Sequence, residues 1–180
     1  MRKITLWEGY HRKIEDITID DFLNRVKYGH WKESVDYVRS FKTKDEIKKA
    51  KDNVVGATIS GTFEDQKRKQ DALITHSGFL CVDIDNQGTE AEQLKNDQYT
   101  YAFFKSITGK GAAIIVKVNP EKHKESYQFL SEYYFAQYGL VVDEAPKNPA
   151  SLRFVSYDPD LFINEKAVKS KHKAEKVFKP

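Results

Sequence analysis

The sequence predicts an α+β domain in which a mostly antiparallel sheet carries helices on one face, with a helical segment ahead of it. Two observations indicate this class. Helical apolar spacing dominates the first fifty residues, and β-branched runs joined by short turns then alternate with helical patterns. The 180 residues, 32% charged and 39% hydrophobic, suffice for one buried core and have the composition of a soluble globular protein.

Composition also bears on location. No apolar run approaches the ~20 residues that cross a bilayer, and Glu8 comes too early for a signal peptide. The single cysteine, Cys81, has no partner for a disulfide or a cysteine zinc site. We therefore expect a cytoplasmic protein without a membrane partner.

The first segment, residues 1–52, is predicted to be helical and to pack on the core that follows. Thr18–Asp21 resembles a capping box at the start of an apolar helical pattern. Trp31, Val35 and Val38 then recur at i, i+4 and i+7, which is one face of a second helix.

Residues 53–164 are predicted to form the core. The clearest helix begins at Asn119-Pro120 and ends before Gly139. Residues 165–180 contain six lysines and are predicted to be a basic linker or tail. Runs rich in β-branched and aromatic residues predict strands over 54–63, 78–84, 99–104 and 112–118, with shorter ones over 140–142 and 152–157.

Asp83 and Asp85 are the main candidates for chemistry. They end the apolar run 78–84, and residues i and i+2 of a strand project from the same face. Two neighbouring carboxylates repel each other, and a divalent cation such as Mg²⁺ or Mn²⁺ would relieve that repulsion. The alternative is that Asp85 begins a turn and Asp83 caps a nearby group.

Three further features follow along the chain. Ser106–Gly111 places two glycines beside a lysine, which suits a phosphate-binding turn or an ordinary hairpin turn. Asp143 ends a short apolar run as Asp85 does, either as a third ligand or as a turn residue. Arg153 enters an apolar strand and therefore needs an anion, either a structural carboxylate or a bound phosphate.

Taken in order, these motifs resemble the archaeo-eukaryotic primase superfamily, and more closely the VirE N-terminal-type domains of bacterial mobile elements. The matching pattern is an apolar strand with Asp-x-Asp, then Ser-x-Thr-Gly-x-Gly, a helix, an apolar-Asp and an arginine strand, over about residues 53–164. Ser60–Phe63 and Ser156–Pro159 fit the narrower group.

The resemblance implies an RRM-like catalytic core, often fused to a C-terminal helicase or ATPase. It would transfer nucleotides to a nucleic-acid 3′-hydroxyl during replication of a mobile element or plasmid. The implied partners are a nucleoside triphosphate and nucleic acid, DNA before RNA, with Mg²⁺ or Mn²⁺ as cofactor. By position, the metal-binding catalytic carboxylates would be Asp83, Asp85 and Asp143, and the nucleotide phosphates would contact Ser106, Gly109, Lys110, Gly111 and Arg153.

One departure leaves the activity open. Active members usually carry a histidine two residues past the second glycine, where this chain has Ala113. A second hypothesis is therefore a non-catalytic module that binds nucleic acid or nucleotide beside a fused helicase. A third is a metal-dependent nuclease, because RNase H-like enzymes also place an aspartate in a central apolar strand.

Overall fold

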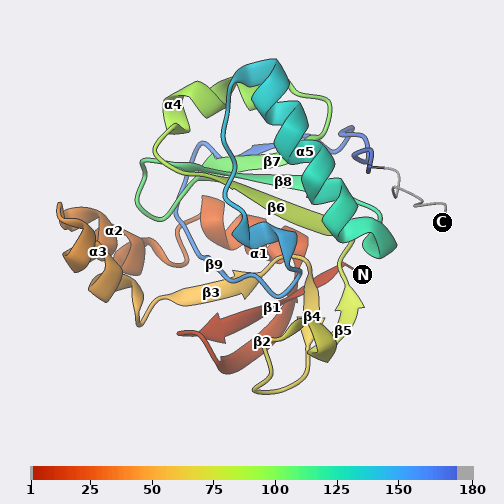
Figure 1. Ribbon diagram of the computed structural model, residues 1–180. Coiled ribbons are helices and arrows are strands. Elements are labelled where there is room, and N and C mark those ends of the chain that lie inside the picture. Colours follow the sequence, from red (N-terminus) through yellow and green to blue (C-terminus); the bar gives the residue numbers. More distant parts are fainter. Residues whose placement is uncertain (1, 174–180) are drawn as a thin grey trace.

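The computed structural model describes residues 2–173 and has an α+β fold built on two antiparallel sheets (Figure 1). Strand order in the first sheet is β10 (Phe162–Ile163), β7 (Thr100–Lys105), β8 (Ala112–Lys117) and β6 (Phe79–Ile84). The second sheet runs β2 (Arg12–Thr18), β1 (Lys3–Glu8), β3 (Val55–Thr58) and β9 (Arg153–Phe154). A hairpin of β4 (Gly61–Phe63) and β5 (Leu73–His76) completes the strands of the described residues.

One face of the first sheet is covered by α4 (Gly88–Ala91) and α5 (His123–Tyr138), as Figure 1 shows. Leu80, Val82 and Ile84 of β6 point into this layer, as alternation along a strand requires. Helix α5 ends at Gly139, whose φ of 68° is left-handed. The order β6-α4-β7-β8-α5, with β8 between β6 and β7, agrees with the expected RRM-like arrangement, except that the fourth strand, β10, pairs with β7 and not with β6.

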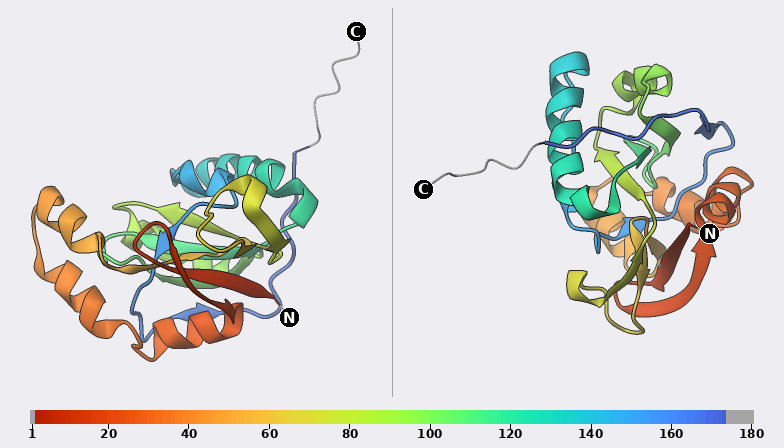
Figure 2. Two further views of the ribbon diagram at one scale, coloured as in Figure 1. Left: turned by 90° about the horizontal axis from the view of Figure 1, so that it is seen from below. Right: turned by 90° about the vertical axis from the view of Figure 1, so that its right-hand side faces the viewer.

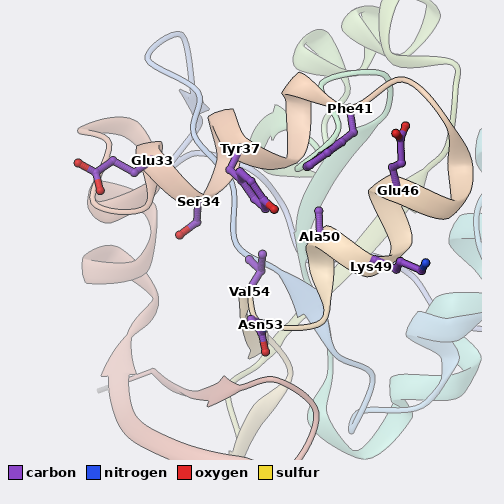
Figure 3. Close-up of a pocket in the computed structure, with 9 residues that line it drawn as sticks. All are labelled: Glu33, Ser34, Tyr37, Phe41, Glu46, Lys49, Ala50, Asn53 and Val54. Atoms are coloured by element: carbon purple, nitrogen blue, oxygen red, sulfur yellow. The ribbon is translucent and has the colours of Figure 1, made fainter.

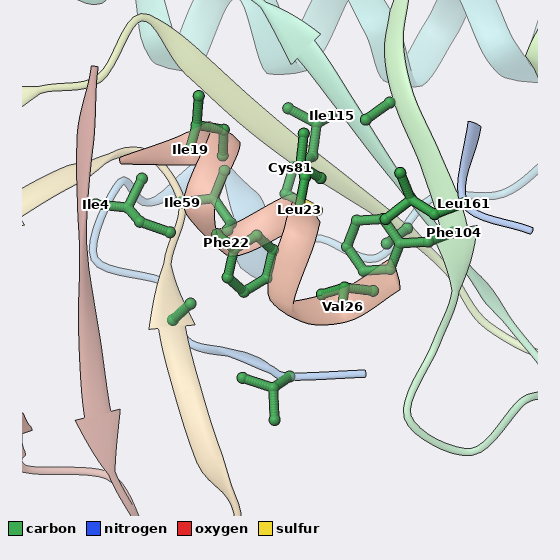
Figure 4. Packing of buried hydrophobic residues seen from close by; sticks show 14 of the residues in the cluster. Ile4, Ile19, Phe22, Leu23, Val26, Ile59, Cys81, Phe104, Ile115 and Leu161 are labelled. Atoms are coloured by element: carbon green, nitrogen blue, oxygen red, sulfur yellow. The ribbon is translucent and has the colours of Figure 1, made fainter. Parts of the chain in front are cut away.

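The opposite face of the first sheet packs on α1 (Ile19–Lys27) and the second sheet. Cys81, Phe104 and Ile115 meet Phe22 and Leu23 there in one buried cluster (Figure 4). Since both faces of β6 are buried, its sequence is a continuous apolar run up to Asp83.

Two short helices, α2 (Lys32–Ser40) and α3 (Lys44–Lys51), extend from one end of this body, as Figures 1 and 2 show. Helix α3 begins with the capping box of Thr43 and Glu46. Val35 and Val38 anchor α2 in the core, whereas no residue of α3 is fully buried.

The structure corrects the expectation for the N-terminal segment. The first fifty residues are not all helical, because residues 3–18 form β1 and β2. Ile4 and Leu6 alternate with Lys3 and Thr5 at the start of β1, and Gly9 makes the turn with a φ of 57°, so this is a hairpin pattern. β1 also pairs with β3, so segments 1–52 and 53–164 share one sheet.

Three other expectations differ from the structure. Residues 140–142 are not a strand, although the Asp143 N–H donates to the Asp83 carbonyl at 2.9 Å. The predicted strand over 152–157 is reduced to β9, which belongs to the second sheet. Residues 165–173 are not a solvated tail: the Ser170 N–H donates to the Lys117 carbonyl, and Ala167 is buried. The remaining predicted tail, 174–180, lies outside the described residues.

None of the helices within residues 2–173 combines the length and the apolar character needed to span a bilayer. Cys81 is buried in the cluster between the two sheets, and burial raises the pKa of its thiol.

Candidate functional site

A cavity of about 220 Å³ lies where the end of β6 faces β9. We call it the carboxylate pocket, because Asp83, Asp85 and Asp143 all line it. Ser106 and Arg153 line it too, so the structure brings five of the eight predicted site residues to one place. Their chemical roles remain predictions.

The carboxylates reach the pocket from two segments. Asp83 shares a face of β6 with Phe79 and Cys81, which point between the sheets, and Asp85 follows two residues later. Asp143 is held beside β6 by the bond from its N–H to the Asp83 carbonyl. The Asp143 carboxylate also accepts from the Ala145 N–H at 3.2 Å, which is the turn role considered above.

Arg153 forms an ion pair with Asp83 inside the pocket. The arginine is only 8% exposed, and its Nε has no hydrogen-bond partner among the described residues. Burial lowers the pKa of the guanidinium. The anion that Arg153 meets in this structure is therefore a carboxylate, the first of the two possibilities raised by the sequence.

The small side chain of Ala113 leaves the space that the Arg153–Asp83 ion pair occupies. Asp83 on β6, Ala113 on β8 and Phe104 on β7 lie in one row across the sheet. The Arg153 guanidinium bonds Asp83 at one end of the row and lies 5.2 Å from the Phe104 ring at the other. It therefore crosses the site of Ala113, where a histidine would compete with it for space.

The Ser106–Gly111 turn differs from the expected phosphate cradle. The N–H groups of Gly109 and Gly111 donate to Ser106, and that of Lys110 donates to Thr108. These backbone donors are therefore already used within the turn. Gly109, Lys110 and Gly111 line a neighbouring cavity of about 520 Å³ and do not line the carboxylate pocket.

Sequence reasoning missed three polar residues near the pocket. Lys51, at the end of α3, lines it and lies 5.6 Å from the Phe154 ring. Burial lowers the pKa of Lys51, although the charge of Asp85 opposes that shift. Thr108 also lines the pocket and bonds Ser106 through its hydroxyl at 3.1 Å. No motif distinguishes Lys51 from the other lysines of α3, so only the fold could identify it.

Arg39 is the third residue. From the last turn of α2, its guanidinium donates to the carbonyls of Ser106 at 3.0 Å, Ile107 at 3.1 Å and Tyr157 at 3.1 Å. It therefore fixes the start of the Ser106–Gly111 turn against the segment that follows β9. Its placement at a helix end gives no sequence signal for this role.

The carboxylates of the pocket are suitable ligands for a divalent cation, but their present arrangement is not that of a metal site. Mg²⁺ takes one or two carboxylates and completes its shell with water and substrate phosphates. Asp83 and Asp85 are the residues that would hold it. Within residues 2–173, however, no group of three histidine, cysteine, aspartate or glutamate side chains is placed to hold a metal, and Asp83 is paired with Arg153.

The chain matches a known family model. The model described as the BT4734-like, N-terminal domain covers residues 49–162, most of the chain. The chain belongs to this family. The BT4734-like domains are a family of bacterial mobile-element proteins. No curated protein and no solved structure matches the chain.

The BT4734-like region contains the whole carboxylate pocket. It begins in α3 just before Lys51 and includes Asp83, Asp143 and Arg153. Helix α2, which carries Arg39, precedes it. The pocket therefore lies within the family domain, whereas Arg39, which fixes the Ser106–Gly111 turn, lies outside it.

Proposed function

We propose that this domain is a primase-polymerase-like domain of a mobile-element or plasmid replication protein. It transfers a nucleotide from a nucleoside triphosphate to a nucleic-acid 3′-hydroxyl, with Mg²⁺ or Mn²⁺ as cofactor. DNA is the expected nucleic acid, and a fused C-terminal helicase or ATPase is the expected partner domain.

The observation that carries the proposal is the charge arrangement of the carboxylate pocket. Three carboxylates, of Asp83, Asp85 and Asp143, face two cations, of Lys51 and Arg153, around one cavity. A triphosphate with its divalent cation presents complementary charges, since phosphates pair with arginine and lysine while the cation takes carboxylate oxygens. The match to a mobile-element family adds support.

Each residue of the pocket has its own role in this proposal. Lys51 and Arg153 bind and orient the triphosphate, and Arg153 exchanges Asp83 for a phosphate when the nucleotide enters. The hydroxyls of Ser106 and Thr108 lie at the pocket wall and supply neutral hydrogen bonds. A bound divalent cation would lower the pKa of the attacking hydroxyl and neutralise the leaving pyrophosphate.

A second function is favoured by the Asp83–Arg153 pair itself. The pair neutralises the central carboxylate without a metal, and Ala113 leaves room for it. The domain would then bind nucleotide or nucleic acid without catalysis and position a fused helicase. In that case the pocket recognises phosphate and performs no transfer.

Primer extension tests the first function. The purified domain is incubated with a primed template, labelled deoxynucleotides and Mn²⁺. We expect incorporation by the wild type and a loss of about a hundred-fold or more in Asp85→Asn. Asp85 is chosen because it is exposed and its loss leaves the buried Asp83–Arg153 pair intact.

Asp160→Asn is the matched control, because it removes an exposed aspartate outside the pocket. Equal incorporation by the wild type and Asp85→Asn would contradict the proposal. Nucleotide binding without any incorporation would establish the non-catalytic alternative. Metal-dependent shortening of the template, lost in Asp85→Asn, would indicate a nuclease.

A further inference from the structure

A second, much smaller cavity shares the Asp83–Arg153 ion pair with the carboxylate pocket. It has a volume of about 10 Å³, and we call it the inner cavity. Its remaining lining residues are Ile59, Ser60, Cys81, Pro146 and Ser151. None of these five lines the carboxylate pocket, so the ion pair is the boundary between the two spaces.

Arg153 brings an unused hydrogen-bond donor to this boundary. Its Nη1 group bonds Asp83, but its Nε–H has no partner among the described residues, and the side chain is almost fully buried. A buried N–H that bonds neither protein nor water is rare, because nothing offsets the loss of its hydration. The Nε–H of Arg153 therefore needs a partner that fits inside the fold.

Two serine hydroxyls line the inner cavity from different segments. Ser60 is buried in the turn between β3 and β4. Ser151 precedes β9, in a turn that its N–H closes with the Asn148 carbonyl at 2.9 Å. Neither hydroxyl has a hydrogen-bond partner within residues 2–173. The inner cavity therefore gathers two free hydroxyls beside Arg153 and the Asp83 carboxylate.

The size and the charge of the inner cavity both favour water as its occupant. A volume of about 10 Å³ is close to the smallest that admits one water molecule, and it excludes a phosphate or an organic group. The charges of Asp83 and Arg153 oppose each other, so the lining offers no net charge to an ion. A water molecule can accept from an N–H and donate to two oxygens, which matches the groups present.

We propose that the inner cavity binds one water molecule, which accepts a hydrogen bond from Arg153 Nε and donates to the hydroxyls of Ser60 and Ser151. The water holds the Nε side of the guanidinium while its Nη groups exchange Asp83 for a phosphate. Ser60 and Ser151 are then positioning residues for Arg153, which gives a role to the first residue of the Ser60–Phe63 motif. The exchange with phosphate rests on the proposed function, but the water site does not.

Oxygen-17 relaxation dispersion tests the water site, because it counts the long-lived water molecules of a protein. We expect the count to fall by about one in Ser60→Ala/Ser151→Ala, since a buried water needs about three polar partners. Ser126→Ala is the matched control, because it removes a fully buried, unpaired hydroxyl that does not line the inner cavity, and its count should equal that of the wild type. Equal counts in the wild type and the double variant would overturn the proposal.

A second measurement needs only the wild type. The Arg153 Nε–H proton, assigned by through-bond correlation, should show a nuclear Overhauser effect to water while it exchanges slowly with the solvent, because the side chain is buried. The absence of this effect in the wild type would overturn the proposal, even if the double serine variant failed to fold.

The positioning role is tested by isothermal titration with dATP and Mg²⁺ in the absence of a primer. Ser60→Ala/Ser151→Ala should raise the Kd about five-fold, the loss of one hydrogen bond that acts through Arg153. The same two substitutions should have no effect in the Asp83→Ala/Arg153→Leu background, which contains no unpaired buried charge and lacks the guanidinium. An equal effect in both backgrounds would show that the serines do not act through Arg153.

The two proposals can fail separately. If the wild type neither binds dATP nor extends a primer while the double serine variant loses a water, the water site stands and the positioning role falls with the proposed function. If the count and the Nε–H contact show no bound water, the water site is wrong, whatever the activity.

Discussion

Helix α3 contributes to both the carboxylate pocket and a cavity of about 560 Å³ between α2 and α3, the α2–α3 groove (Figure 3), yet the charged groups of the two sites differ in their partners. In the pocket, Arg153 neutralises Asp83, and Lys51 lies within the influence of Asp85. In the groove, Lys49 has no salt bridge within the described residues, and Tyr37 is 59% exposed. The central charges of the pocket are paired with each other, whereas Lys49 and the Tyr37 ring of the groove are exposed.

This difference predicts how each site responds to substitution. A ligand in the pocket must replace interactions that already exist, so the pocket can discriminate by charge and geometry. Exposed side chains such as those of the groove contribute little to the stability of a fold. Substitutions in the pocket should therefore change stability and function together, while those in the groove should change stability little.

The largest expected effect is that of Asp83→Ala. It leaves the Arg153 guanidinium buried and unpaired, which should lower the free energy of unfolding by about 3 kcal/mol. Tyr37→Ala in the groove should stay within about 0.5 kcal/mol of the wild type. Urea denaturation in the presence of a chelator measures both.

The double variant Asp83→Ala/Arg153→Leu is the control for this prediction. Removing both charges should recover much of the lost stability, because the unpaired buried cation is then absent. If Asp83→Ala proves no more destabilising than Tyr37→Ala, the Asp83–Arg153 pair does not stabilise the fold and the comparison fails.

Arg39 joins α2 to the Ser106–Gly111 turn, and its loss should have the second largest effect. Arg39→Ala removes the donors to the Ser106, Ile107 and Tyr157 carbonyls and should cost about 2 kcal/mol. Amide exchange should become faster in the Ser106–Gly111 turn relative to β8. Arg12→Ala, on a side chain that is 67% exposed, should change neither quantity. Unchanged exchange in the turn would show that Arg39 does not position it.

The sequence allowed three of the four strands of the first sheet, and helix α5, to be predicted. β6, β7, β8 and α5 were predicted because their apolar spacing is regular and their ends carry glycine, proline or aspartate. The shared face of Asp83 and Asp85 followed from the two-residue period of a strand. These features depend on neighbouring residues, which a sequence shows directly.

The second sheet was predicted only in part. Strands were expected around β3 and β9, but the local β1–β2 hairpin was predicted to be helical, and the pairing of β3 with β1 and β9 joins distant residues. β3 meets β9 through Gly56 and Phe154, far apart in the chain, and no local pattern specifies that pairing. The sequence could not identify the partner of Arg153 either, because Arg153 reaches Asp83 only where the two sheets pack together. Lys51 and Arg39 likewise acquire their positions from tertiary contacts.

A hydrogen-bonded histidine pair, His76 and His123, lies behind the segment that follows Asp143 and has no counterpart in the groove. The Gly78 N–H donates to His76 Nδ1 at 3.0 Å, so the His76 proton is on Nε2 and donates to His123 Nδ1, also at 3.0 Å. His123 Nε2 then donates to the Pro146 carbonyl at 2.9 Å. Both rings are therefore neutral, and they tie β5 and α5 to the segment after Asp143.

Acid should loosen this histidine pair, with the smallest of the expected effects. Burial, with a further contribution from His123, lowers the pKa of His76 to about 4, and burial also lowers that of His123. The unfolded chain therefore binds more protons than the folded one between about pH 6.5 and 4, so stability rises with pH and is lost as pH falls through this window. For His76, allowing for partial exposure, the loss from pH 7 to pH 5 should be about 1.5 kcal/mol.

Urea midpoints at pH 7 and pH 5 test this expectation. His76→Gln should be less stable than the wild type at pH 7 and should lose less stability at pH 5, because the titrating ring is gone. His172→Gln, at an exposed position, should keep the wild-type dependence. A wild-type pH dependence in His76→Gln would mean that other groups control the acid sensitivity, and the pocket and the groove would then not differ in this respect.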